Sequence, residues 1–367
     1  MGPATPLRGL RVVALEQAVA APFATARLAD AGADVHKIER PEGDFARGYD
    51  RAAGSVSSYF AWLNRGKRSV VLDLKTAEAR AELAALVAEA DVFVQNLKPG
   101  AAARLGFDPA VLCAQYSRLI SCSISGFDDS GPNAGRKAYD LLIQAESGLC
   151  SLTGGPSEPA RVGISVVDIA TGATAHAAIL EALIARGQTG EGADIRVSMF
   201  DVMADWLAVP LLNHEAGNTP RRVGLAHPSI APYGVFATGD GAAILISVQS
   251  DREWGQLCDH LLARPALATD PRFATNLART DHRGETDSLL AAAFAGLTRS
   301  EALARLVKAD TAYAEVNDMA GLSRHSELKR IVVHVPGGEA SLPRPAAVFR
   351  GAERRLGPVP ALGEDGA

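Results

Sequence analysis

Cysteine is scarce in this sequence, and the cysteines that are present form no recognisable pattern. Four occur in 367 residues, at Cys113, Cys122, Cys150 and Cys258, and none belongs to a CxxC pair. Zinc sites and disulfide frameworks need cysteines at characteristic spacings, so both are disfavoured and no metal is expected. The composition predicts a reducing, cytoplasmic setting.

Aromatic residues and clustered positive charge are also scarce. Aromatic residues make up 5% of the chain, the formal net charge is −5, and the 37 basic residues form no long run. A nucleic-acid-binding protein needs a basic surface, often with aromatic side chains on which unpaired bases stack. No nucleic-acid partner is expected.

Long apolar runs and the common catalytic motifs are absent as well. No stretch approaches the roughly 18 apolar residues of a membrane span, and the start MGPATPLRGLRVVALEQ lacks a signal-peptide pattern. There is no GxxxxGK[ST], GxSxG or HExxH motif. The sequence therefore predicts a globular protein without a membrane partner.

The first part of the chain alternates between strand and helix patterns. Continuous Val/Ile/Leu runs predict strands at 11–15, 35–38, 69–74, 91–96, 119–125, 161–167 and 193–197. Helical patterns fall between most of them, at 22–32, 76–90, 138–148 and 169–186. This alternation predicts an α/β fold with a Rossmann-like, mostly parallel sheet. The first strand-to-helix connection, LEQAVAAPFAT, has no glycine, so NAD and FAD are disfavoured.

A smaller α/β domain is expected in the second half. The stretch NTPRRVGLAHPSIAP reads as a connector, and GVFATGDGAAILISV predicts a hairpin around TGDG. Helices are predicted at 251–262, 279–294 and 300–308, and strands return in the tail at 330–349. The predicted domains are a large one (1–215, completed by 330–367), a linker (216–232), a small one (233–310) and a return linker (311–329).

Asp168 is out of place in the stretch VGISVVDIATG, because it follows an apolar run and precedes an alanine-rich helical pattern. By spacing alone, the simpler interpretation is that this aspartate caps the helix. A catalytic role is the alternative. The two interpretations are compatible, since the positive end of a helix dipole favours an ionised carboxylate, the form that a nucleophile requires.

Several ordered stretches resemble the family III CoA transferases, the CaiB/BaiF family. They include LRGLRVVALEQAVAAPFATARLADAGADVHKIERPEGDFAR, NRGKRSVVLDLK, ADVFVQNLKPGAAARLGFD, GRKAYDLLIQAESGLCSLTG and VGISVVDIATG. The resemblance implies a large Rossmann-like domain, a small domain, two linkers and an interlocked homodimer. It also implies coenzyme A as part of the substrate, with an acyl-CoA donor and a carboxylic acid acceptor.

The resemblance makes Asp168 the covalent nucleophile of a double displacement. It implies CoA contacts from a set of mostly polar residues, namely Arg40, Leu72, Lys75, Asn96, Arg104, Lys137 and Tyr139. Guanidinium and ammonium groups suit phosphates, although any single Lys or Arg is more often a solvated surface charge. The glycine-rich stretch GGP at 154–156 and the connector 223–228 are candidate sources of oxyanion donors, and His227 is a candidate substrate or interface residue.

Two alternatives remain open at this stage. A 2-methylacyl-CoA racemase of the same superfamily would use a His-Asp pair where this chain has Tyr139 and Asp140, and a tyrosine with an ordinary pKa is a poor base. An inactive CoA-binding protein is the other. Among transferases, KAYDLLIQAESG and HPSIAPYGVF most resemble enzymes of short dicarboxylic acids, such as mesaconyl-CoA C1–C4 CoA transferase.

Overall fold

The computed structural model describes residues 5–350, 354 and 356–366. Contacts within the chain divide it into two compact units. The first unit comprises Met1–Cys150, Arg161–Leu212 and Lys329–Ala367, and the second comprises Ser151–Ala160 and Asn213–Leu328. The first unit is therefore assembled from separate stretches of the sequence.

A six-stranded parallel sheet forms the centre of the first unit, in the order β3-β2-β1-β4-β5-β6. Its strands are β1 (Arg11–Leu15), β2 (Asp34–Glu39), β3 (Arg68–Val71), β4 (Val92–Gln95), β5 (Ile120–Ser125) and β6 (Ala193–Ser198). This is the strand order of a doubly wound Rossmann fold, in which the winding reverses between β1 and β4. The predicted α/β fold is confirmed.

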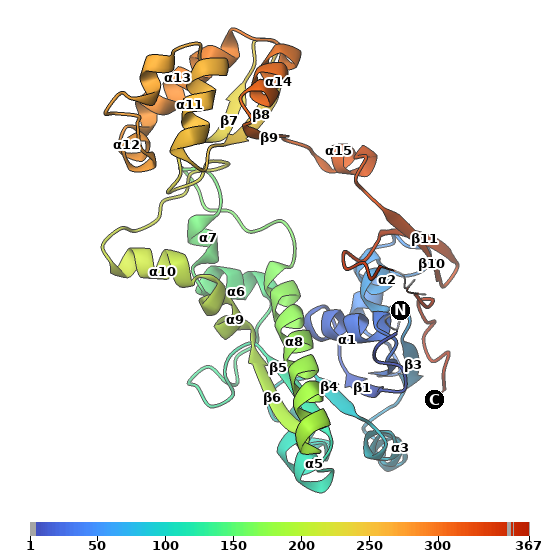
Figure 1. The fold of residues 1–367 in the computed structure, drawn as a ribbon. Coiled ribbons are helices and arrows are strands. Elements are labelled where there is room, and N and C mark those ends of the chain that lie inside the picture. The colour runs from blue at the N-terminus through green and yellow to red at the C-terminus, as the bar shows by residue number, and fades with distance from the viewer. Residues whose placement is uncertain (1–4, 351–353, 355, 367) are drawn as a thin grey trace. The chain divides into compact units, whose positions relative to one another are not determined.

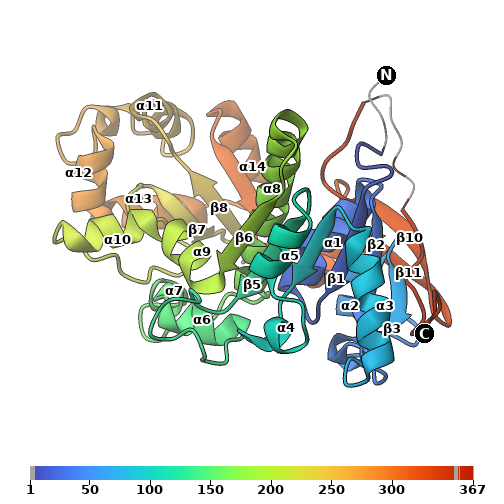
Figure 2. The same ribbon diagram turned by 90° about the horizontal axis from the view of Figure 1, so that it is seen from below.

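Helices cover both faces of this sheet (Figures 1 and 2). On one face, Val12 and Ala14 pack in one apolar cluster with α1 (Ala20–Asp30) and α8 (Val166–Thr189). On the other, Val13 and Leu15 pack in a second cluster with α3 (Ala77–Ala88) and α5 (Pro109–Gln115). Successive residues of a strand point to opposite faces, so a strand buried on both sides must be apolar throughout.

Shorter helices complete this part of the chain. They are η1 (Phe45–Gly48), α2 (Ser58–Asn64), α4 (Ala101–Arg104), α6 (Asp140–Glu146), α7 (Leu149–Leu152), α9 (Met199–Trp206) and α10 (Ala208–Glu215). Of the helices in the described residues, α8 alone is long and apolar enough to cross a membrane by length and composition. Its buried face contacts α1 and the sheet, as in the core helix of a globular protein.

The predicted strand at 161–167 is wrong. Residues 161–165 form no regular structure, and α8 begins at Val166. The apolar run that suggested a strand belongs partly to the first turn of the helix, where Val167 is fully buried. β-propensity is a weak guide when tertiary packing buries the same side chains in a helix.

Small residues let α1 and α8 approach closely. A Cβ atom added to Gly172 would lie 2.4 Å from the backbone oxygen of Ala20 and 2.8 Å from Cβ of Phe23. Only a residue without a side chain fits at this crossing. The close contact ties the beginning of α1 to the first turns of α8.

The second unit contains a three-stranded sheet covered by helices. Its strands β7 (Tyr233–Ala237), β8 (Ala243–Ser247) and β9 (Ala312–Glu315) are antiparallel, which confirms the hairpin around TGDG. Its helices are α11 (Asp251–His260), η2 (Pro265–Ala268), α12 (Asn276–Asp281), α13 (Arg283–Ala295), α14 (Arg299–Lys308) and α15 (Met319–Arg324). The helix predicted at 279–294 is thus two helices, because the backbone leaves helical geometry at His282.

The tail returns to the first unit as the antiparallel hairpin β10 (Arg330–Val335) and β11 (Gly338–Pro343). Val333 and Val335 pack against Phe60 of α2 in one buried cluster. Ser55 donates hydrogen bonds to the Pro336 carbonyl from both its N–H (3.0 Å) and its Oγ (2.6 Å). Segments at opposite ends of the sequence therefore share one core.

Candidate active site

A cavity of about 480 Å³ opens at the carboxyl ends of the paired central strands β1 and β4, where the winding of the sheet reverses. Gln17 follows β1 and Asn96 follows β4. The Asn96 amide bonds the backbone of Gln17 in both directions, with Oδ1 accepting from its N–H (3.0 Å) and Nδ2 donating to its carbonyl (2.9 Å). Ligands of doubly wound folds bind at this reversal point.

Asp168 lines this cavity, from the first turn of α8. It is not the N-cap residue. That position belongs to Ser165, whose side chain makes no capping bond and instead lies 3.2 Å from the Tyr59 hydroxyl. The cap comes from another helix, because Asp140 Oδ1 accepts hydrogen bonds from the N–H groups of Val167 (2.8 Å) and Asp168 (3.2 Å).

The carboxyl of Asp168 is unusually hard to ionise. Burial, and then the neighbouring charge of Asp140, raise its pKa to about 7. The expectation that the helix dipole keeps this group fully ionised is therefore wrong near neutral pH, since desolvation outweighs the dipole. The protonated and ionised forms are both populated there.

Three tyrosines share this cavity with Asp168. Tyr49, Tyr59 and Tyr139 all line the cavity, and the rings of Tyr49 and Tyr59 meet edge to face at 5.6 Å. Burial, and then the charges of Asp44 and Asp168, raise the pKa of Tyr49 to about 12. Tyr49 therefore keeps its proton at neutral pH, so its hydroxyl is able to donate a hydrogen bond to a ligand in the cavity.

A strained residue forms part of the same wall. Ala18 has φ of 64°, in the left-handed region that a side chain disfavours. Its N–H donates to Asp44 Oδ1 (3.2 Å). Asp44 is itself held by Lys37 (2.8 Å), and both side chains are fully buried. The conformation of this wall is therefore fixed by ionic contacts behind it.

The buried cation Lys37 belongs to a larger ionic cluster of Glu16, Lys37, Asp44 and Lys67. Glu16 accepts from Lys67 (2.7 Å) and from the Thr25 hydroxyl (2.6 Å), and it lies 3.6 Å from Lys37. The charged side chains of this cluster are fully buried. Buried charges persist in a fold only when they are paired in this way.

A second cavity, of about 240 Å³, adjoins the first and shares Gln17 and Leu97 with it. Three of the predicted CoA contacts, Arg40, Leu72 and Lys75, line this second cavity. Asn96, Lys137 and Tyr139 line the Asp168 cavity. Six of the seven predicted contacts thus lie along one path that ends at Asp168, whereas Arg104 lies on α4 and lines neither cavity.

The predicted oxyanion donors and His227 belong to the second unit. Three backbone N–H groups in 223–228 are already used: Gly224 donates to Gly154 (3.1 Å), Ala226 to Val223 (3.1 Å) and His227 to Tyr233 (3.1 Å). His227 also stacks on the Tyr233 ring, with centroids 5.3 Å apart. These contacts shape the loop itself, and the bonded N–H groups are not free to hold an oxyanion.

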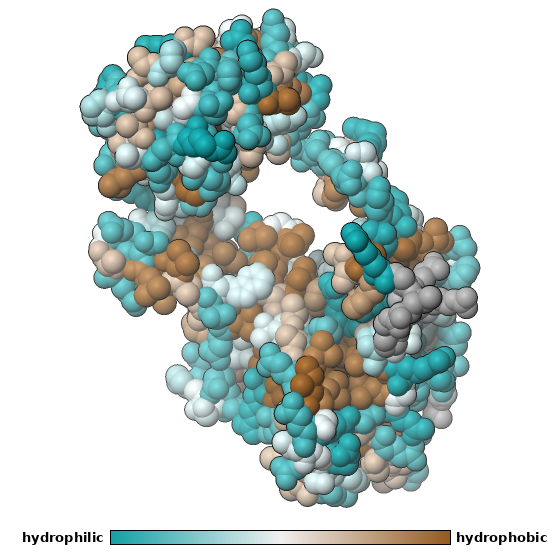
Figure 3. Space-filling model, in the orientation of Figure 1, coloured by the Kyte–Doolittle hydropathy of each residue, from teal (hydrophilic) through white to brown (hydrophobic). Residues whose placement is uncertain are grey.

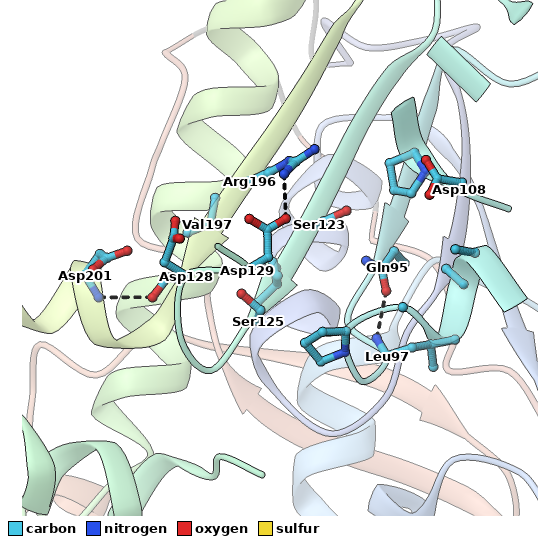
Figure 4. Close-up of a pocket in the computed structure, with 17 residues that line it drawn as sticks. Gln95, Leu97, Asp108, Ser123, Ser125, Asp128, Asp129, Arg196, Val197 and Asp201 are labelled. Carbon is cyan, nitrogen blue, oxygen red and sulfur yellow. Dashed lines mark hydrogen bonds and ion pairs between the residues drawn. The ribbon is translucent and has the colours of Figure 1, made fainter. Parts of the chain in front are cut away.

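A third cavity, of about 180 Å³, lies next to the Asp168 cavity and shares Leu97 and Ser125 with it. Figure 4 shows Arg196 at its wall, directed toward Asp129. Arg196 pairs with Asp129 (2.5 Å) and with Asp194 (3.1 Å). Its charge is neutralised within the protein, so this cavity is a poor anion site.

The sequence alone did not reveal the roles of Asp140, Gln17 and the tyrosines at 49 and 59. A local signal existed only for Asp140, because a helix whose own first residues supply no cap needs an acceptor from elsewhere. The other residues meet Asp168 only through the fold.

Comparisons with known proteins point to one family. The sequence profile described as CoA-transferase family III matches residues 7–366. A succinate–glutarate CoA-transferase from Agrobacterium fabrum is 41% identical over 295 residues, 78% of this chain and 73% of that protein. An acetyl-CoA:oxalate CoA-transferase from Acetobacter aceti is 41% identical over 304 residues, 82% and 77% of the two chains. The crystal structure of a CAIB/BAIF family protein from Brucella suis has 38% identity and a TM-score of 0.83, covering 99% of this chain and 97% of that one.

Proposed function

The chain belongs to CoA-transferase family III, and we propose that Asp168 is the covalent nucleophile with which it moves CoA from an acyl-CoA to a carboxylic acid. The observation that carries this proposal is the position of Asp168. Its carboxyl lies in a cavity at the reversal point of the sheet, next to a second cavity that offers cations and an apolar wall.

Each step of the proposed reaction exchanges bonds at a carbonyl carbon. An Asp168 oxygen attacks the thioester carbonyl and the C–S bond breaks. CoA thiolate departs, and Asp168 is now joined to the donor acid in a mixed anhydride. The thiolate then attacks the Asp168 carbonyl, which releases the first acid and forms an aspartyl-CoA thioester. The acceptor carboxylate reverses these steps, so a new acyl-CoA and the free Asp168 carboxylate result. Covalent catalysis of this kind divides one difficult step into easier ones.

Coenzyme A is proposed to extend from the second cavity to Asp168. The apolar wall of Leu72, Leu74 and Leu105 suits the adenine ring, while Arg40 and Lys75 at the same cavity suit phosphate groups. The thiol arm would then pass Leu97 and Gln17, which both cavities share. No metal, NAD or FAD has a role in this scheme.

Removal of either cation should weaken CoA binding. We expect Arg40→Ala and Lys75→Ala each to raise the Kd for CoA about tenfold, since a charge-assisted hydrogen bond contributes roughly 1.5–3 kcal/mol. Isothermal titration calorimetry with CoA measures this change. Lys308→Ala, at an exposed position of α14 in the second unit, is the matched control. Unchanged affinity in both cavity variants would show that Arg40 and Lys75 are ordinary surface charges that do not contact CoA.

Racemisation is the second candidate, because a racemase of this superfamily would abstract the proton next to the thioester. The structure offers a poor base for it. Tyr139 is 63% exposed. The Asp140 carboxylate already accepts hydrogen bonds from backbone N–H groups and from the Gln144 amide. Both observations favour transfer.

Heavy water separates these candidates. Incubation with a 2-methylacyl-CoA in D₂O should leave the α-carbon undeuterated, because transfer touches only carbonyl bonds. In the same preparation, succinyl-CoA and labelled glutarate should exchange CoA. Mass spectrometry of the thioesters measures both. Rapid deuteration without CoA exchange would make the protein a racemase. The absence of both reactions would make it an inactive CoA-binding protein.

Short dicarboxylic acids are the proposed substrates, including transfer between the two carboxyls of one diacid. The support is the similarity to relatives that are named for glutarate and oxalate. The cavity also carries cations that could receive a second carboxylate, among them Lys98 and Arg161.

An interlocked homodimer is proposed as the assembled form. Apolar side chains lie exposed on α9 and α10, where Trp206, Val209 and Leu212 are each more than half accessible. Figure 3 shows apolar residues gathered along α10. A contiguous apolar surface of this kind marks a protein contact.

His227 stays a proposed substrate or interface residue. The cytoplasm is the proposed location, and the four free cysteines support it.

A further inference from the structure

Helix α6 holds the segment that carries the nucleophile. Asp140 and Gln144 lie one turn apart on α6, so their side chains share a face of the helix. Both reach the backbone of residues 162–168. Gln144 Oε1 accepts from the Val162 N–H (2.9 Å), and Asp140 Oδ1 accepts from the N–H groups of Val167 (2.8 Å) and Asp168 (3.2 Å).

The two side chains also fix each other. Gln144 is completely buried, and its Nε2 donates to Asp140 Oδ2 (2.6 Å). Each oxygen of Asp140 is therefore engaged, one by the amide and one by the first turn of α8. An amide that donates on one side and accepts on the other admits a single orientation.

This cap replaces what the segment itself lacks. The first N–H groups of a helix have no partner within the helix, and the Ser165 side chain does not supply one. Residues 161–165 also have no regular structure to hold them. Without Asp140, the turn that carries Asp168 would lose its anchor at both N–H groups.

The cap brings a charge as well as an acceptor. A neutral side chain could fill the role of acceptor, as Ser and Asn do at most helix starts. The aspartate instead places a second carboxylate beside the first. Two neighbouring carboxylates repel, and this repulsion ends when Asp168 becomes an anhydride or a thioester, because both are uncharged.

We propose that Asp140 is a positioning residue for the reaction: it holds the backbone of the nucleophile, and its negative charge opposes the free Asp168 carboxylate and so favours the acylated form. This inference rests on the proposed role of Asp168. The proposed role requires a charged cap. A neutral cap would hold the backbone but would not oppose the charge of Asp168.

Other charged and titratable groups face the same cavity and must be kept constant in a test. They are Tyr49, Asp50, Tyr59, Lys98, Arg136, Lys137, Tyr139 and Arg161. Arg136 pairs with Glu146 (2.7 Å). Asp140, unlike these groups, bonds the backbone of Asp168. The raised pKa of Asp168, to about 7, follows from burial first and from Asp140 second.

Asp140→Asn separates charge from capping. Its Oδ1 can still accept from the first turn of α8, but the charge is gone, and so is the bond from Gln144, because the new Nδ2 faces the donating Gln144 Nε2. We expect the midpoint of the Asp168 titration to fall by about one pH unit, and the acid limb of the transfer rate to move with it. Asp140→Ala loses the acceptor too, and its kcat should fall about 10²-fold at pH 8, the order expected for a misplaced nucleophile.

Infrared difference spectroscopy on the CoA-free enzyme reads the Asp168 titration directly, with Asp168→Asn identifying the band. This readout does not depend on transfer, so a failure of the proposed function leaves it intact. Asp201→Asn is the matched control, because Asp201 is also the third residue of its helix. A titration midpoint that stays in place in Asp140→Asn, or a kcat for Asp140→Ala equal to that of the control, would overturn the proposal.

Discussion

Asp168→Asn is expected to abolish CoA transfer while leaving the fold and CoA binding unchanged. The amide has nearly the shape of the carboxyl but cannot attack a thioester, and loss of a covalent nucleophile lowers kcat by a factor of about 10³ or more. Steady-state transfer from succinyl-CoA measures the loss, and titration calorimetry with CoA checks binding.

Two controls make this result specific. Asp201→Asn changes an exposed carboxyl at the same helix position of α9, and it should retain wild-type activity. Hydroxylamine added during turnover should convert Asp168 to a hydroxamate, which mass spectrometry locates in the peptide. Transfer by Asp168→Asn at a rate close to wild type, with no trapped aspartate, would refute covalent catalysis at this residue.

Glu16→Ala is expected to lower the free energy of unfolding by about 3–5 kcal/mol, the usual loss when one partner of a buried ion pair is removed. Glu16 accepts from Lys67 and stands near Lys37, and all three side chains are fully buried. Without the carboxylate, the buried Lys67 loses its ion-pair partner, and Lys37 keeps only its pair with Asp44. Urea denaturation followed by circular dichroism measures the change.

The exposed Glu82→Ala on α3 is the control, and it should change the free energy of unfolding by less than about 0.5 kcal/mol. Glu16→Gln keeps an acceptor for Lys67 and should lie between the two. Burial lowers the pKa of Lys67 to about 8. A loss in Glu16→Ala no larger than that of the Glu82→Ala control would show that the cluster matters little for stability.

The sheet was predictable from the sequence because its strands are buried on both faces. Runs such as Val12–Val13 and Val92–Phe93–Val94 contribute to the clusters on both sides, so their pattern has no other stable outcome. The run before Asp168 misled the prediction, because its backbone partners lie on α6, far away in the sequence. A local pattern cannot show an acceptor that only the fold supplies.

The candidate site was predictable in part, and for a similar reason. Arg40, Leu72 and Lys75 each follow a strand of the sheet, so their arrival at one edge follows from the topology. The buried ionic cluster was not predictable, because Lys37 and Lys67 look like ordinary surface lysines when only their neighbours in the sequence are known. Their burial depends on Glu16, which follows β1, and on Asp44, which lies in the loop after β2.

The return of the tail to α2 sets an order of events during synthesis. Ser55 and the Pro336 carbonyl that it bonds are 281 residues apart. At about 5–20 residues per second, a ribosome needs on the order of 15–60 s to make the intervening chain. During that time Phe60 and its apolar neighbours on α2 stay uncovered, because Val333 and Val335, which pack against them, have not yet been made. The nascent first unit therefore exposes this apolar surface until translation is almost complete, and a chaperone would be expected to bind there.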